Sequence, residues 1–199
     1  MDVINMFKKT ILATAVAAMA MGSVSAMAAD VGLITFDGAV TDTTCVITTN
    51  NGVEANNVTV TLPVVKKADV EGTTVDKGVG SKEFELHLSE CPDTLTKASA
   101  TFSSQQFAEL SNGTLKSDPT VSGHADNVSL ALYNNTAASS ARVLIGQPDN
   151  NTQEAALTSG EGTLAYRVAY VPSADWVKGT NDIASGKVSS NVTFTMNYK

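Results

Sequence analysis

The C-terminal end of the chain alternates between apolar and polar side chains, and this pattern most constrains the fold. After Gly186, five apolar residues share one parity: Val188, Val192, Phe194, Met196 and Tyr198. A period of two predicts a β-strand with a single apolar face. Only Lys199 follows this strand, so the strand cannot continue into a hairpin.

A similar alternation occurs near the N-terminus. Gly32, Ile34, Phe36 and Gly38 share one parity, and Val40 continues it. Two alternating segments, one near each end, favour a chain that gives a strand to another molecule or receives one from it.

The first 28 residues have the features of a secretory signal peptide. Two lysines precede an apolar run over 11–21, and small residues follow it. This order is typical of an export signal, and the apolar run is too short for a membrane anchor. We expect cleavage after Ala26 or Ala28, export from the cytoplasm, and no membrane insertion after cleavage.

Composition excludes several classes of function for the rest of the chain. Its length suits one domain, and the net charge of −7 for the whole sequence argues against nucleic acid or an anionic membrane as a partner. His87 and His124 are the only histidines, and there is no C-x-x-C motif. We therefore expect no metal, no other cofactor and no catalytic residue, and hence no enzyme.

Cys45 and Cys91 are the only cysteines. An exported chain with an even number of cysteines most simply pairs them, so we expect a disulfide. A catalytic or metal-binding pair is the competing interpretation, and neither the spacing nor the neighbouring residues favour it.

Short alternating runs separated by turn residues recur along the remaining chain. We expect strands around Val58–Leu62, Glu83–Leu88, Ala100–Phe102, Val128–Leu132, Val143–Ile145, Leu164–Tyr170 and Lys187–Tyr198. Helical turns are expected only within Val64–Val70 and Gln105–Leu110. Such spacing predicts an all-β protein, an antiparallel sandwich or barrel.

Together, the N-terminal alternation, the two cysteines and the C-terminal alternation resemble the subunits of chaperone–usher pili, in particular the major-subunit type of type 1 fimbriae. Gly186 stands fourteenth from the C-terminus and Tyr198 stands second. In that family, a glycine and an aromatic residue at these places form the pattern that the chaperone recognises.

The resemblance implies a fold and a mechanism. The fold is an incomplete immunoglobulin-like β-sandwich that is completed by a donor strand from a neighbouring subunit. Residues 1–28 are then the signal peptide, 29–44 the N-terminal donor-strand extension, and 45–199 the pilin domain. The donor positions are Gly32, Ile34, Phe36, Gly38 and Val40. The C-terminal positions that the chaperone recognises are Gly186, Val192, Phe194, Met196 and Tyr198.

The resemblance also implies partners and a location. A periplasmic pilus chaperone, an outer-membrane usher, other copies of the chain and other pilus subunits are expected, on a route through the periplasm to a cell-surface fimbrium used in adhesion. A minor adaptor or terminator subunit of the same pilus is an alternative. A secreted carbohydrate-binding β-sandwich is a further alternative from another class.

Overall fold

The computed structural model describes residues 44–50 and 58–199. Contacts divide the chain into two compact units, 1–36 and 37–199, and the description below concerns the second. The predicted signal peptide and the five donor positions from Gly32 to Val40 lie outside the described residues. Within the described ranges, no helix is long and apolar enough to span a membrane.

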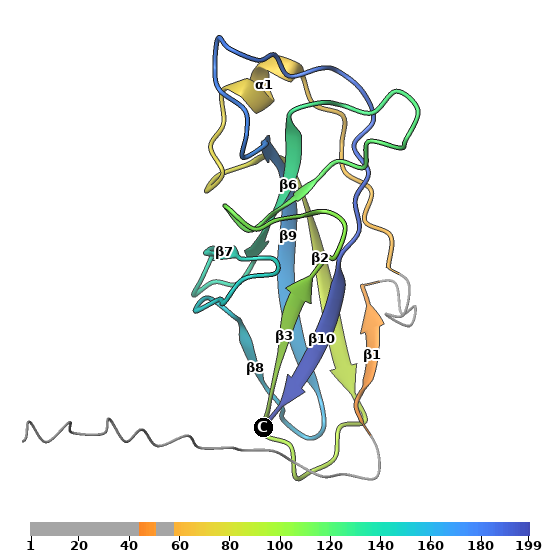
Figure 1. The fold of residues 1–199 in the computed structure, drawn as a ribbon. Helices are drawn as coiled ribbons and strands as arrows, with labels where there is room; N and C mark the ends of the chain where they lie inside the picture. The colour runs from red at the N-terminus through yellow and green to blue at the C-terminus, as the bar shows by residue number, and fades with distance from the viewer. Residues whose placement is uncertain (1–43, 51–57) are drawn as a thin grey trace, which may run out of the picture. The chain divides into compact units, whose positions relative to one another are not determined.

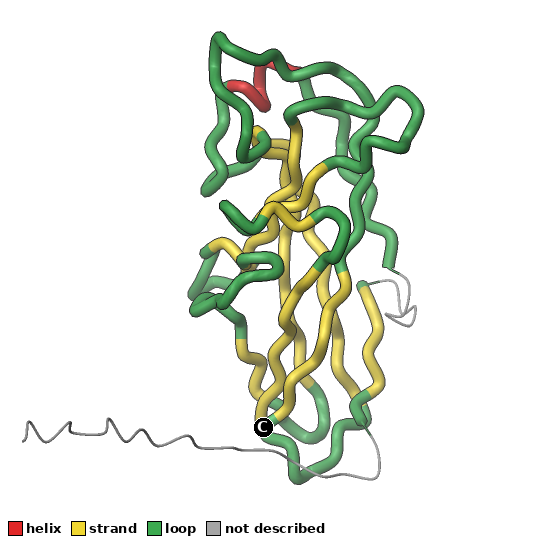
Figure 2. Tube along the Cα trace, viewed as in Figure 1, coloured by secondary structure: helices red, strands yellow, loops and turns green. Residues whose placement is uncertain are grey.

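Two antiparallel sheets make up the described unit (Figure 1). The larger sheet contains β1 (Val46–Thr49), β2 (Val79–Ser89), β9 (Gly162–Pro172), β6 (Val128–Asn134), β5 (Thr114–Lys116) and β4 (Ala108–Glu109), in that order, with β7 (Arg142–Val143) also paired to β6. The smaller sheet contains β10 (Thr193–Tyr198), β3 (Lys97–Ser103) and β8 (Glu154–Ala156). The short helix α1 (Lys67–Glu71) lies among loops at one end (Figure 2).

The main core contains side chains from both sheets. Leu86, Leu132 and Leu164 from the larger sheet belong to the same buried cluster as Phe102 from β3. The ring of Phe102 meets the ring of Tyr166 edge to face, with 5.0 Å between centroids. Alternation along each strand therefore directs one parity into a shared interior, as the sequence predicts for a sandwich.

The predicted disulfide is confirmed. Cys45, just before β1, is bonded to Cys91, just after β2, and the two Cα atoms lie 4.2 Å apart. The bond joins the ends of two paired strands across a separation of 46 residues. In the loop-closure model, a crosslink of that span stabilises the fold by roughly 4 kcal/mol.

Most predicted strands are present, and the differences are local. β2, β3, β6, β7 and β9 cover or overlap the predicted runs, and α1 overlaps the first predicted helical turn. Within the second predicted helical turn, residues 105–107 form a turn that does not extend to 110. Ser104 Oγ accepts a hydrogen bond from Phe107 N (3.2 Å), and the chain then enters β4. A single turn fixed by a serine hydroxyl has helical spacing over too few residues to continue.

Two other predicted strands are shorter or absent. β10 begins at Thr193, and Lys187 makes only an isolated bridge with His124. Residues 58–62 join neither sheet within the described part of the chain. The alternation of apolar residues indicates which side chains face the interior. A β-strand also needs a neighbouring strand at hydrogen-bonding distance, which residue spacing does not predict.

Candidate strand-acceptor site

β10 and β1 are edge strands. β10 pairs only with β3, and β1 pairs only with β2, within the described residues. Apolar side chains near both edges nevertheless pack against the same core cluster. Within the described residues, the two sheets therefore share an interior that is bounded on one side by two edge strands.

A row of half-buried apolar side chains follows β10. Its burial alternates strictly, with Phe194, Met196 and Tyr198 half-buried and the residues between them exposed. Val192 continues the half-buried parity before the strand begins. Burial raises the pKa of the Tyr198 phenol, as expected for a side chain partly removed from water. The row packs against the core on one side and stays partly accessible on the other.

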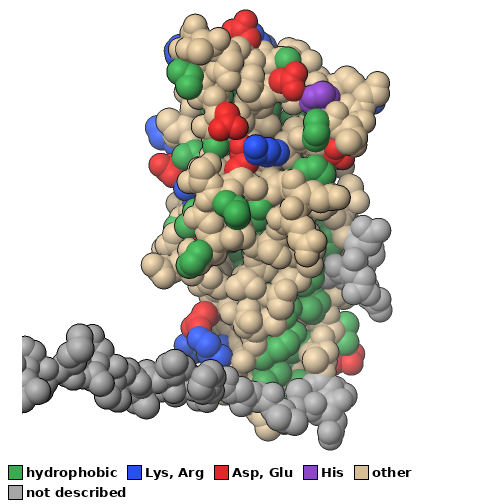
Figure 3. Space-filling view, in the orientation of Figure 1, with side chains coloured by type: hydrophobic (Ala, Val, Ile, Leu, Met, Phe, Trp, Pro, Cys, Tyr) green, Lys and Arg blue, Asp and Glu red, His purple; other side chains and the backbone are tan. Residues whose placement is uncertain are grey.

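Residues 58–62 have the same alternation. Val58, Val60 and Leu62 are half-buried and pack against the core cluster, while Thr59 and Thr61 are exposed. We call the two rows together with Ile47 of β1 the open strip. Its members are Ile47, Val58, Val60, Leu62, Val192, Phe194, Met196 and Tyr198. Figure 3 shows hydrophobic side chains gathered in a band low on the face where Figure 1 draws β10.

The open strip could accept an extended segment. An edge strand presents unpaired N–H and C=O groups along its free side, and a new strand can bond to them. Alternate side chains of such a strand would enter the half-buried apolar row. The strip offers no titratable group between its apolar members on β10, so burial of apolar side chains is the chemistry that it provides.

The last residue holds β10 in register. Lys199 O accepts hydrogen bonds from Thr96 N (2.7 Å) and Lys97 N (3.0 Å), and Lys199 N donates to Lys97 O (3.0 Å). Glu154 on β8 receives Lys199 Nζ at 2.6 Å and Lys97 Nζ at 3.0 Å. Hydrogen bonds from these two lysines lower the pKa of the Glu154 carboxyl. These contacts hold β10 against β3, although no strand among the described residues pairs with its second edge.

Gly186 lies where the segment leading to β10 crosses another backbone. Lys187 N donates to Gly123 O (2.7 Å), and Ala125 N donates to Lys187 O (2.8 Å). A Cβ on Gly186 would stand 2.5 Å from Gly123 O and from His124 O. Glycine is therefore required here by a close backbone approach.

The structure brings together four of the five predicted C-terminal residues. Val192, Phe194, Met196 and Tyr198 share one face, whereas Gly186 lies before them at the backbone crossing. Sequence reasoning did not assign the other half of the open strip to the site. The alternation of Val58, Val60 and Leu62 is the signal in the sequence, but the same alternation is typical of an ordinary paired strand.

Known proteins match this chain over most of its length. The family model described as "Fimbrial protein" matches residues 34–199. The laminin-binding fimbrial subunit ElfA of Escherichia coli O157:H7 is 29% identical over 96% of this chain and 99% of that protein. Long polar fimbria protein A of Salmonella typhimurium is also 29% identical, over 98% of both chains.

Among solved structures, the CupB6 tip adhesin of Pseudomonas aeruginosa aligns with a TM-score of 0.49 and 15% identity, over 64% of this chain and 33% of that one. At that TM-score the likeness adds nothing to the assignment. The family match and the full-length relatives are sufficient: this chain belongs to the fimbrial protein family and is a structural subunit of a fimbrium.

Proposed function

We propose that this subunit polymerises by donor-strand exchange. Residues 29–44 of one copy would lie along the open strip of the next copy and complete its sandwich. The observation that carries the proposal is the edge position of β10, whose apolar row is half-buried and whose second edge has no partner strand in the described residues.

The donor segment matches the open strip in chemistry and period. Ile34 and Phe36 share a parity with Gly32, Gly38 and Val40. Burial of each large apolar side chain would contribute about 1.5–3 kcal/mol. The backbone of the donor would form a ladder with the free edge of β10. Gly32 would lie at a tight place in the acceptor, where a side chain would clash.

The same strip would be occupied before assembly. A periplasmic chaperone would cover it during export, reading Gly186, Val192, Phe194, Met196 and Tyr198, and an outer-membrane usher would catalyse its replacement by the donor strand. This order gives the chain a route through the periplasm to the cell surface. It also gives the chain a structural role with no catalytic step and no cofactor.

A pair of aspartate variants on β10 tests the acceptor strip. Met196→Asp puts a charge into the half-buried row, and Thr195→Asp puts the same charge on the exposed face one residue away. We expect Met196→Asp to abolish fibres in electron micrographs and oligomer ladders on SDS gels. Thr195→Asp should assemble normally. Equal assembly of the two variants would rule out the open strip as the acceptor.

A second pair tests the donor. Gly32→Trp should block polymerisation and leave the chaperone complex in the periplasm, because the indole cannot enter the acceptor. Thr35→Trp lies on the opposite parity and serves as the matched control. Normal fibres from Gly32→Trp would exclude the donor assignment.

A deletion tests chaperone recognition of the C-terminus. Deleting residues 197–199 should remove the chaperone complex from the periplasm. An unchanged complex after the deletion would exclude chaperone recognition of the C-terminus.

A further inference from the structure

A small apolar cluster, which we call the end cluster, lies at the end of the described unit that holds α1. Its buried members are Val70, Ala125, Val128 and Ile183, and Val65, Val79, Tyr170, Trp176 and Val188 pack against it. Figure 1 shows that residues 58–66 and residues 184–192 both leave this end of the unit and run toward β1 and β10. Both rows of the open strip are therefore connected to one small core.

The row over 58–62 depends on packing for its position. It joins neither sheet within the described part of the chain, so no ladder fixes it there. Pro63 and Val64 follow the row and are exposed. Val65 is the next residue that packs inward, and it contacts the end cluster. Val65 is thus the first apolar anchor after the row.

Gly80 on β2 makes room for the side chain of Val65. A Cβ on Gly80 would stand 2.4 Å from Val65 Cγ1, and Gly80 has a φ of +61°. The register of β2 with β9 shifts between Val79 and Lys82, so Gly80 lies in an irregular part of the strand. A side chain at this position would be strained and would displace Val65, whose branched side chain has few alternative rotamers. The glycine therefore lets Val65 lie directly on the strand.

The row of β10 is attached to the same end. Val188 packs against both the end cluster and the main core. Backbone hydrogen bonds also tie residues 184–189 to the loop over 117–127, and they run from Asp118 N to Ser189 O (2.7 Å) and from Ala184 N to Asp126 O (3.1 Å).

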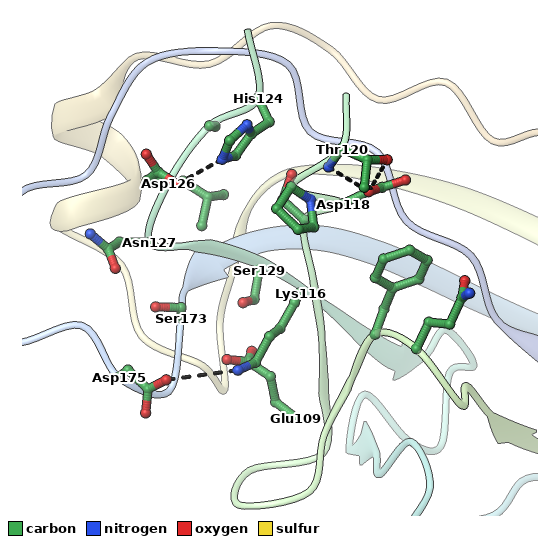
Figure 4. A pocket seen from close by; sticks show the side chains of 16 residues that line it. Glu109, Lys116, Asp118, Thr120, His124, Asp126, Asn127, Ser129, Ser173 and Asp175 are labelled. Carbon is green, nitrogen blue, oxygen red and sulfur yellow. Dashed lines mark hydrogen bonds and ion pairs between the residues drawn. The ribbon is translucent and has the colours of Figure 1, made fainter. Parts of the chain in front are cut away.

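Side chains brace the loop over 117–127 from within. Asp118 Oδ1 accepts hydrogen bonds from Thr120 N (2.8 Å) and Thr120 Oγ1 (2.7 Å) (Figure 4). His124 Nε2 lies 2.8 Å from Asp126 Oδ1 on the same loop. The row of β10 is thus held by its ladder with β3 and by a braced loop, whereas the row over 58–62 depends on its packing.

We propose that the end cluster positions the open strip for its partner strand, and that Val65, seated on Gly80, is the positioning residue for the row over 58–62. The inference rests on the donor-strand exchange proposed above. An added strand fits only where the apolar rows stand at the right spacing, because neighbouring strands lie about 4.8 Å apart. A row that is already in place also spares the complex the cost of ordering it. Displacing Val65 would therefore weaken donor binding without changing any residue of the open strip.

A pair of glycine variants tests the inference in the full chain, refolded at low concentration to limit self-assembly. The probe is a fluorescent peptide of residues 29–44, and anisotropy measures its affinity. Gly80→Ala should weaken binding by roughly tenfold, because part of the burial of the donor's apolar side chains is lost. Gly78→Ala is the control, since Gly78 also has a positive φ (+66°) but its Cβ would overlap Ala169 Cβ (2.5 Å) rather than Val65. Gly78→Ala should bind the peptide as the native chain does, and equal affinities of the two variants would overturn the inference.

A second substitution separates positioning from a general loss of stability. Adding Val65→Ala to Gly80→Ala removes the methyl group that overlaps, and the new methyl group occupies the space that it leaves. The affinity should return toward the native value, although the double variant has lost a further apolar contact. A general loss of stability would grow with each substitution, so an affinity that stays low or falls further would contradict the inference.

A milder pair keeps the test decisive if Gly80→Ala does not fold. Val70 in the end cluster is 3% exposed, and Val171, in a separate cluster on the larger sheet, is 0% exposed. Val70→Ala and Val171→Ala make the same change at two buried sites, and thermal unfolding verifies that both variants are folded. Val70→Ala should weaken peptide binding several-fold, and Val171→Ala should not. Equal affinities would refute the inference alone, whereas a native chain that fails to bind the peptide would refute donor-strand exchange and this inference with it.

Discussion

β6 and β10 look alike in sequence and differ in their environment. Leu130 and Leu132 alternate along β6 much as Phe194 and Met196 alternate along β10. All residues of β6 are buried, since β9 pairs on one side and β5 and β7 on the other. Phe194 and Met196 are only half-buried, because β10 has a partner on one side alone within the described residues.

Under the proposed donor-strand exchange, this difference would separate the residues that stabilise the subunit from those that serve assembly. The apolar row of β6 is completed by this unit's own strands, so its burial stabilises the subunit. The row of β10 is only half-buried in this unit, so part of its burial energy would be available to the proposed donor strand. The hydrogen bonds of Lys199 with Thr96 and Lys97 and its ion pair with Glu154 explain how the half-buried row of β10 is held in place.

The largest effect should come from truncating equivalent residues on the two strands. Leu132→Ala should lower the free energy of unfolding of the subunit by about 2–5 kcal/mol, as for other buried leucines. Met196→Ala should cost about 1 kcal/mol in the uncomplexed subunit, because its side chain is only half-buried. Denaturant titration of both variants measures the difference.

Adding a peptide of residues 29–44 sharpens that test. The cost of Met196→Ala should rise toward the range of a buried core residue once the peptide completes the sandwich, while the cost of Leu132→Ala should stay the same. Identical costs for the two variants in the peptide-free subunit would contradict the contrast between the strands.

An intermediate effect is expected at Gly186. Gly186→Ala should destabilise the subunit by about 1–3 kcal/mol, since its Cβ would overlap backbone atoms at the crossing. Thermal unfolding without any chaperone measures this cost, and Ser185→Ala, at an exposed neighbouring position, is the control. A normal midpoint for Gly186→Ala would leave chaperone recognition as the only role of this glycine.

The smallest effect should be a pH dependence of stability that comes from the ion pairs of Glu154 with Lys97 and Lys199. The pKa of Glu154 is lowered from its ordinary value of 4.5 by Lys199 and Lys97. A depressed carboxyl pKa stabilises the fold above the unfolded-state pKa, and this contribution is lost as the pH falls through the folded-state pKa. The difference in unfolding midpoint between the native chain and Glu154→Gln should therefore be present at neutral pH and vanish on acidification. A difference that persists in acid would show that the ion pairs are not its source.

Local pattern was sufficient for much of the fold. The alternation of Leu164 to Tyr170 predicted β9, and the alternation of Phe84 to Leu88 predicted β2. Local sequence was sufficient there because apolar and polar residues alternate between the two faces of a strand. The pairing of Cys45 with Cys91 followed from the residue count and the export signal. The face shared by Val192, Phe194, Met196 and Tyr198 likewise followed from parity alone.

Tertiary structure decided what lies beside each strand. Only the fold shows that residues 58–62 join no sheet in the described part of the chain, that they share the core with β10, and that Gly186 is required by the backbone at Gly123. Side-chain period is a local property of the chain, whereas edges, crossings and shared interiors arise from residues that are distant in sequence. The sequence by itself thus determined the apolar faces of this protein, and long-range packing determined which of those faces are fully buried and which are only half-buried in the described residues.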